Sequence, residues 1–83
     1  MEAIEAPADD YLPTGPPGEV TTTVRLNIRK GAPNTSVPIY QTVQRGTRLS
    51  HIGIVEDGEP VNGNPVWYVD NNGNFFWSGG VAV

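Results

Sequence analysis

Few side chains in this 83-residue sequence could support acid–base or nucleophilic chemistry. His51 is the single histidine, and it lies in a predicted strand next to Ser50; the other serines are Ser36 and Ser78. A Ser–His–acid triad needs three positioned groups and an oxyanion site, and the sequence indicates no orienting acid or oxyanion site near His51. We therefore interpret His51 as a surface or half-buried side chain and predict a protein that is not an enzyme, with no catalytic residues.

The sequence evidence for a metal site is as weak as that for catalysis. Glu56, Asp57 and Glu59 offer the carboxylate oxygens that calcium prefers, but the spacing of an EF-hand loop is absent. The sequence contains no cysteine, which excludes thiolate metal sites and disulfide bonds. We interpret residues 56–65 as a solvated polar loop, and we expect no metal site and no cofactor.

The aromatic residues point to a binding feature more strongly than the polar residues point to catalysis or metal binding. Residues 66–80 contain five of the seven aromatic side chains in the chain. Asn72-Gly73 lies between two apolar runs, which predicts paired strands joined by a type I′ turn, because both central residues of that turn need positive φ. The five aromatic residues are Trp67, Tyr68, Phe75, Phe76 and Trp77.

Alternation along the two strands divides these aromatic residues between two faces. Phe76 and Tyr68 are the expected core residues, and Trp67, Phe75 and Trp77 then occupy the opposite face. Three large aromatic side chains are more apolar surface than a monomer normally exposes. For Trp67 and Trp77 the pattern leaves two interpretations open, a binding surface or a role in closing one end of the core.

Length and composition indicate the scaffold that must position this hairpin. Eighty-three residues make at most one domain, and 10 glycines and 8 prolines among short apolar runs favour an all-β fold. Residues 1–19 carry five acidic and no basic residues, whereas residues 20–83 carry five basic and four acidic ones. The near-neutral second part argues against nucleic-acid binding. No apolar run is long enough to span a membrane.

Residues 1–19 contain four of the eight prolines and no hydrophobic periodicity, so we predict a flexible, disordered acidic tail or linker. Pro13 to Pro16 also match a P-x-x-P ligand pattern. A folded domain is expected over residues 20–83.

Further strands are expected around the hairpin, giving five or six in a small, partly open barrel. Strand 20–28 places Val24, Leu26 and Ile28 in the core, strand 37–43 places Val37, Ile39 and Val43 there, and strand 47–55 places Leu49 with Ile52 or Ile54 there. Pro38 indicates an edge strand or the start of a strand, and Gly53 indicates a bulge or bend. Residues 44–46 are expected to form a tight turn, and residues 81–83 a last strand or a 3₁₀ turn.

The order of these features resembles bacterial SH3-like domains (the SH3b, or SH3 type 3, family) across residues 20–83. Leu-Asn-Ile-Arg-Lys-Gly-Ala at residues 26–32 is similar to the Leu-Asn-Val-Arg-x-Gly-Pro signature that opens these domains. Gly46-Thr47, the Trp-Tyr-Val strand at residues 67–69 and Phe-Trp-Ser at residues 76–78 follow in the family's order. Ala32-Pro33 in place of Gly-Pro and the long loop 56–65 depart from the pattern.

The resemblance implies a non-catalytic module that targets a larger bacterial protein, secreted or in the cell envelope, to peptidoglycan. The alternative is a protein–protein or autoinhibitory module of a secreted peptidase that recognises an extended or Pro-rich peptide. No signal peptide is present in residues 1–19, and we expect a monomer that belongs to a larger multidomain chain, with no nucleic-acid or membrane partner. The predicted ligand-binding residues are Asn27, Arg29, Tyr40, Trp67, Phe75 and Trp77.

Overall fold

The structure is a computed structural model that describes residues 11–83. The part of the expected disordered tail that comprises residues 1–10 lies outside the described residues. Within residues 11–83, no helix is both long enough and apolar enough to cross a membrane.

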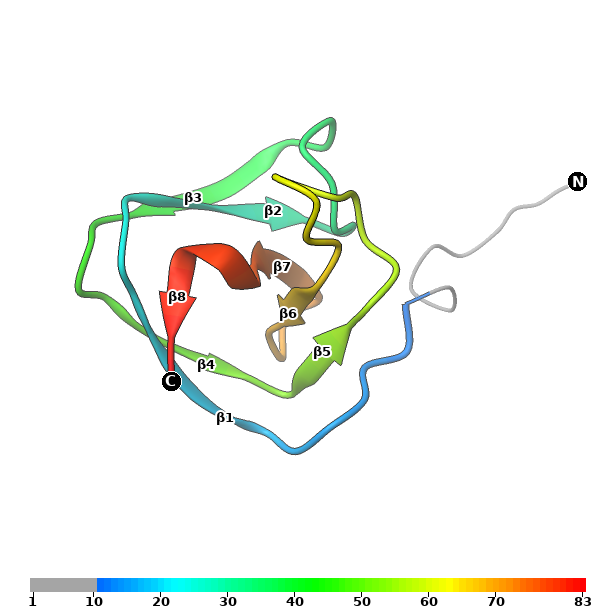
Figure 1. The fold of residues 1–83 in the computed structure, drawn as a ribbon, viewed down its shortest axis with the longest axis horizontal. Helices are drawn as coiled ribbons and strands as arrows, with labels where there is room; N and C mark the ends of the chain where they lie inside the picture. The colour runs from blue at the N-terminus through cyan, green and yellow to red at the C-terminus, as the bar shows by residue number, and fades with distance from the viewer. Residues whose placement is uncertain (1–10) are drawn as a thin grey trace, which may run out of the picture.

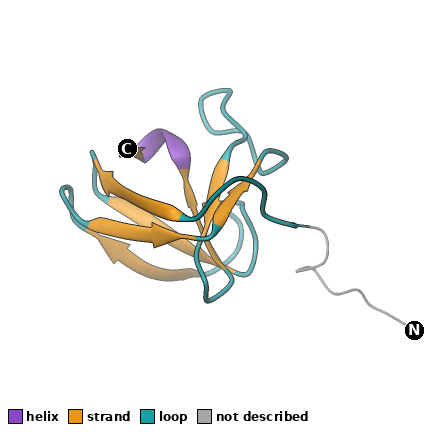
Figure 2. Ribbon diagram, turned by 90° about the horizontal axis from the view of Figure 1, so that it is seen from below, coloured by secondary structure: helices purple, strands orange, loops and turns teal. Residues whose placement is uncertain are grey.

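Short antiparallel strands form the framework of residues 11–83, in two sheets that pack together without closing (Figures 1 and 2). One sheet has the strand order β4-β1-β8 and the other β3-β2-β7-β6-β5. The expected all-β, partly open barrel is therefore confirmed. The elements are β1 (Gly18–Thr22), β2 (Leu26–Lys30), β3 (Ile39–Val43), β4 (Arg48–His51), β5 (Gly53–Val55), β6 (Trp67–Val69), β7 (Asn74–Trp77), the 3₁₀ turn η2 (Ser78–Gly80) and β8 (Val81–Ala82).

Two of the six expected strands are each broken in two, which gives the described residues eight strands. Residues 20–28 form the end of β1 and most of β2, and residues 47–55 form β4 and β5. In both cases the two halves belong to different sheets, so each break is a corner at which the chain passes between sheets. Gly53 forms the second corner with φ of 153°, which confirms the predicted bend.

The inner face of the five-stranded sheet holds the main core. Phe76 is 1% exposed and stacks on Tyr68, with ring centroids 5.4 Å apart. Leu26, Ile28 and Val43 are buried beside Phe76, as predicted. Val20 of β1 and the half-buried Leu49 of β4 join them from the second sheet.

The first corner explains why Val24 was placed incorrectly. A continuous strand would put Val24 on the same face as Leu26, but residues 23–25 lie between β1 and β2, and Val24 is exposed. Ile52, at the second corner, is exposed as well, so Ile54 is the half-buried residue of that pair.

Strand β3 contains the second error in the predicted core. The pairing of β2 with β3 shifts register, so that Ile28 lies opposite Gln41 and Arg29 opposite Ile39, and Tyr40 has no direct partner. Ile39 is exposed in consequence. The strand begins directly after Pro38 and lies at the edge of its sheet, as the proline predicts.

The hairpin of β6 and β7 forms as expected, but its turn is of another type. Gly73 has φ of 79°, whereas Asn72 does not have positive φ, so the turn is not type I′. Asp70 and Asn74 close a three-residue loop, and one Asp70 carboxylate oxygen accepts the backbone N–H groups of Asn72 and Asn74 at 2.8 and 2.9 Å. A carboxylate that satisfies the loop backbone stabilises this longer turn.

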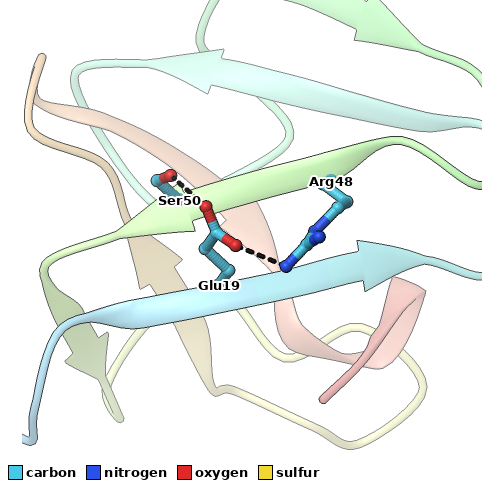
Figure 3. Close-up of polar contacts among 3 residues, drawn as sticks. All are labelled: Glu19, Arg48 and Ser50. Carbon is cyan, nitrogen blue, oxygen red and sulfur yellow. Dashed lines mark hydrogen bonds and ion pairs between the residues drawn. The ribbon is translucent and has the colours of Figure 1, made fainter.

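The ordered part of the chain begins before residue 20. Strand β1 starts at Gly18, and Thr14 already forms an antiparallel bridge with Ile54. The acidic residue Glu19, which we placed in the tail, lies on β1 and forms an ion pair with Arg48 of β4 at 2.6 Å (Figure 3). Both side chains are exposed, so we assign this pair about 0–1 kcal/mol of stability.

Candidate functional site

The outer face of the five-stranded sheet carries the aromatic residues that the sequence singled out. Trp67 lies directly opposite Trp77, and Val69 directly opposite Phe75, in the pairing of β6 with β7. The predicted proximity of the two tryptophans is confirmed. The face is not open to solvent, however: Trp67 is 2% exposed and Phe75 is 4% exposed.

The loop of residues 56–65, here called the cover loop, buries part of this face. The indole N–H of Trp67 donates to the Glu59 carbonyl at 2.9 Å, and that of Trp77 donates to the Asn64 carbonyl at 3.0 Å. Gly58 lies against the Trp67 ring so closely that a Cβ there would be 2.5 Å from ring carbon Cδ1. The two tryptophans therefore hold the cover loop, and their N–H groups are already used within the protein.

A tight hairpin at residues 61–64 gives the cover loop its shape. Asn62 and Gly63 have φ of 51° and 80°, and Val61 and Asn64 exchange two backbone hydrogen bonds of 3.0 and 2.9 Å. Positive φ at both central residues defines the type I′ turn. The Asn64 side chain donates to Ser78 Oγ at 3.0 Å, which ties this hairpin to the end of β7.

Glu59 links the cover loop to a second loop, residues 31–38. Its carboxylate accepts the backbone N–H of Thr35 at 2.9 Å and the Thr35 hydroxyl at 2.8 Å. These two hydrogen bonds, the backbone one first, hold the pKa of Glu59 below the ordinary value of a glutamate, because they favour the ionised form. The Glu59 backbone N–H also donates to the Pro33 carbonyl at 2.9 Å.

Between these loops and β2 lies a hollow of about 240 Å³, here called the tryptophan groove. Part of the Trp77 ring is covered from another side by Gly79, where a Cβ would be only 2.3 Å from ring carbons. The residues that line the groove are Val24, Arg25, Leu26, Asn27, Arg29, Thr35, Val61, Trp67 and Trp77.

The polar lining residues from β2 are held in place by their own partners. The Asn27 side-chain oxygen accepts the Thr42 hydroxyl at 2.7 Å. Arg29 donates from Nη1 to the Val37 carbonyl at 3.2 Å. Arg25, at the first corner, is exposed. The groove thus combines an indole surface with two guanidinium groups and an amide, which suits a ligand that carries carboxylate and apolar or ring groups.

Four of the six predicted binding residues meet in this groove: Asn27, Arg29, Trp67 and Trp77. Trp67 forms its buried floor, and Trp77 is half-buried. The other two do not line it. Phe75 is buried on the outer face of the sheet beneath Tyr11, in a cluster with Trp67 and Val69. Tyr40 is 53% exposed at the β3 bulge.

The prediction missed Arg25, Val24 and Thr35 as lining residues. Arg25 and Val24 were placed on a continuous strand, so the corner that turns them toward the groove was not foreseen. Thr35 was a loop residue with no periodic signal. Its hydrogen bonds to Glu59, which is 24 positions away in sequence, could not be derived from local pattern.

None of the candidate catalytic groups lines this groove. His51 packs on Tyr68, with ring centroids 4.4 Å apart, and its buried Nδ1 has no hydrogen-bond partner. Ser50 Oγ lies 3.5 Å from a Glu19 carboxylate oxygen (Figure 3), and Ser78 Oγ accepts from Asn64. Within residues 11–83, no three histidine, aspartate or glutamate side chains are grouped closely enough to hold a metal ion.

The described residues thus define a small, partly open β-barrel with a cationic aromatic groove on its larger sheet. Comparisons with protein-family models, with curated proteins and with solved structures found no match. The resemblance to bacterial SH3-like domains stays a prediction.

Proposed function

We propose that this chain is a non-catalytic binding module that targets a larger bacterial secreted or cell-envelope protein to peptidoglycan, with the ligand in the tryptophan groove. The observation that supports the proposal is the meeting of Trp77, Arg25 and Arg29 in one hollow. Peptidoglycan offers the matching chemistry, because its stem peptides carry carboxylates and its glycan chains present sugar rings.

In this proposal each residue of the tryptophan groove has its own role in binding. The accessible part of the Trp77 ring packs on a sugar ring or an apolar peptide side chain. Arg25 and Arg29 attract a stem-peptide carboxylate, and Asn27 beside them orients it. Trp67 contributes indirectly, because its buried ring holds the cover loop that forms one wall. Affinity of a single small groove is modest, and linkage to other modules of a longer chain raises it through effective concentration.

A sedimentation assay with purified cell walls tests this proposal. Wild-type protein is expected in the wall fraction, with Arg25→Ala reducing the bound fraction by about tenfold and Trp77→Ala by more. Arg45→Ala is the matched control, since Arg45 is also exposed and does not line the groove. Added salt should weaken the wild-type interaction, because exposed charges are screened.

Two results would contradict wall targeting by this groove. One is a wild-type protein that stays in the supernatant. The other is equal retention of wild type, Arg25→Ala and Trp77→Ala, which would place binding elsewhere. Circular dichroism confirms that each variant is folded before it is compared.

The second candidate function is a protein–protein or autoinhibitory module of a secreted peptidase that recognises an extended or Pro-rich peptide. One observation favours it: Thr14, from the Pro-rich segment of the chain itself, forms an antiparallel bridge with Ile54. Residues 11–19 do not line the tryptophan groove, so a peptide bound in this way would use another surface.

A further inference from the structure

The chain's own residues 11–14 lie along an edge of the larger sheet. Strand β5 is the last strand of that sheet, and the segment passes beside it, as the blue trace in Figure 1 shows. Thr14 and Ile54 exchange two backbone hydrogen bonds, each of 2.8 Å. The Tyr11 ring meets the Phe75 ring edge-on, with centroids 5.6 Å apart and planes at 70°.

The edge of β5 is shaped to receive a backbone at this place. At Gly53 a Cβ would lie 2.7 Å from the Thr14 carbonyl oxygen and 3.0 Å from Pro13 Cβ, so any larger residue would push the segment away. Glycine is also the residue that suits the φ of 153° there. The close approach of Pro13 and Thr14 depends on this missing side chain.

The site is larger than the segment that fills it. A hollow of about 260 Å³ remains beside Tyr11 and Pro13, and it extends over Phe75 to the turn at residues 70–73. We call this hollow, together with the β5 edge, the edge groove. It is largely apolar where Ile52, Val69 and Phe75 line it.

Only a few contacts hold residues 11–14 in place. They comprise one two-bond bridge, one aromatic contact and the packing of Pro13 against Gly53, and Leu12 is 73% exposed. Segments with so few buried contacts open far more readily than the sheet beneath them. When this segment opens, the Ile54 N–H and carbonyl and the Phe75 ring become available to another chain, which is the situation that favours strand addition.

We propose that the edge groove is a docking site for an extended peptide of a partner protein with the pattern aromatic-x-Pro-x, and that residues 11–14 occupy it as an internal competitor. The aromatic residue takes the place of Tyr11 on Phe75, and the last residue pairs with Ile54. The proline precedes the pairing residue, where an antiparallel edge needs no N–H donor. This inference rests on the second candidate function and is independent of wall targeting.

NMR titration of the full ¹⁵N-labelled chain tests the proposal with an end-blocked peptide of residues 11–17 as the probe. The proteins are wild type, Tyr11→Ala, and Leu12→Ala as the matched control, since Leu12 is exposed. In Tyr11→Ala the peptide should shift the amides of Ile54, Gly73 and Phe75. In wild type and Leu12→Ala the apparent affinity should be at least about tenfold weaker, because the tethered segment competes at an effective concentration in the millimolar range. A peptide with alanine in place of tyrosine should bind none of them.

The same spectra contain the results that would overturn the proposal. These are the absence of any shift in Tyr11→Ala, equal shifts in all three proteins, or shifts confined to amides of the tryptophan groove. A wild-type dimer that is lost in Tyr11→Ala, in sedimentation without peptide, would also overturn it, because a second copy would then be the occupant. If Tyr11→Ala loses a dispersed spectrum, Thr14→Pro takes its place, since it removes the N–H that donates to Ile54. Failure of this titration leaves the wall-sedimentation result unaffected, so the two proposals fail separately.

Discussion

The two faces of the five-stranded sheet are both buried, but they are buried by different kinds of structure. The inner face is covered by the second sheet, and its core residues Phe76 and Leu26 belong to regular paired strands. The outer face is covered by the cover loop and by Tyr11, which are joined to the sheet by individual hydrogen bonds and ring contacts.

This difference separates the parts of the molecule that hold the fold from those suited to binding. Opening the inner face requires the two sheets to come apart. Opening the outer face requires only the displacement of the cover loop or of residues 11–14, which costs less free energy than global unfolding. Both proposed binding sites, the tryptophan groove and the edge groove, lie on the outer face.

The adjacent phenylalanines of β7 provide the most direct test of this comparison, because they point to opposite faces. Phe76→Ala should lower the free energy of unfolding by about 4 kcal/mol, since it leaves a cavity between two sheets that cannot collapse. Phe75→Ala should cost less, about 3 kcal/mol, because Tyr11 and its segment can move into the space. Urea denaturation measures both. Equal losses would mean that the two faces are equally rigid.

The attachment of the cover loop gives the second test. Trp67→Phe keeps an aromatic ring but removes the N–H that donates to the Glu59 carbonyl, and we expect a loss of about 2 kcal/mol. Hydrogen exchange should show faster exchange at Gly58 and Glu59, whose N–H groups bond to Pro65 and Pro33. Amides of β1 are the internal control and should change only with global stability. Acceleration of both groups by the same factor would show that the loop does not open separately.

The smallest expected effect concerns the charge-assisted hydrogen bonds between Thr35 and the Glu59 carboxylate, which join the loop of residues 31–38 to the cover loop. Because the folded-state pKa of Glu59 is lowered, its contribution to stability is complete above the ordinary pKa of a glutamate and is lost as the pH falls through the lowered value. Glu59→Gln should therefore be less stable than wild type near neutral pH, and the difference should shrink as the solution is acidified. Urea midpoints of the two proteins, measured across the acidic range, give this comparison. A difference that is independent of pH would assign the stabilisation to hydrogen bonds that do not need the charge.

The local pattern of the sequence was sufficient for part of this structure. Period-two alternation placed Phe76, Leu26 and Ile28 in the core, and Pro38 and Gly53 marked a strand start and a bend. These features depend on residues adjacent in the chain and on backbone sterics, which local sequence encodes. Four groove residues were also identified in this way, because β2 and the hairpin present them at regular spacing.

Two turns show how neighbouring side chains modify a strong local signal. Asn62-Gly63 and Asn72-Gly73 share a dipeptide, yet only the first forms a type I′ turn. At the second, the Asp70 carboxylate binds two backbone N–H groups and stabilises a longer loop. We predicted a type I′ turn only at Asn72-Gly73 and interpreted residues 56–65 as a polar loop, so the type I′ turn at Asn62-Gly63 was not predicted.

The sequence by itself determined that this is an all-β chain with an aromatic hairpin whose Phe76 side is core. Only the tertiary structure decided that the other side is covered as well. Gly58 of the cover loop packs on Trp67, and Tyr11, far away in the chain, packs on Phe75. The corner that redirects Val24 and Arg25 forms because β1 and β2 join different sheets. Alternation states which side chains share a face, whereas burial depends on what the rest of the chain packs against that face.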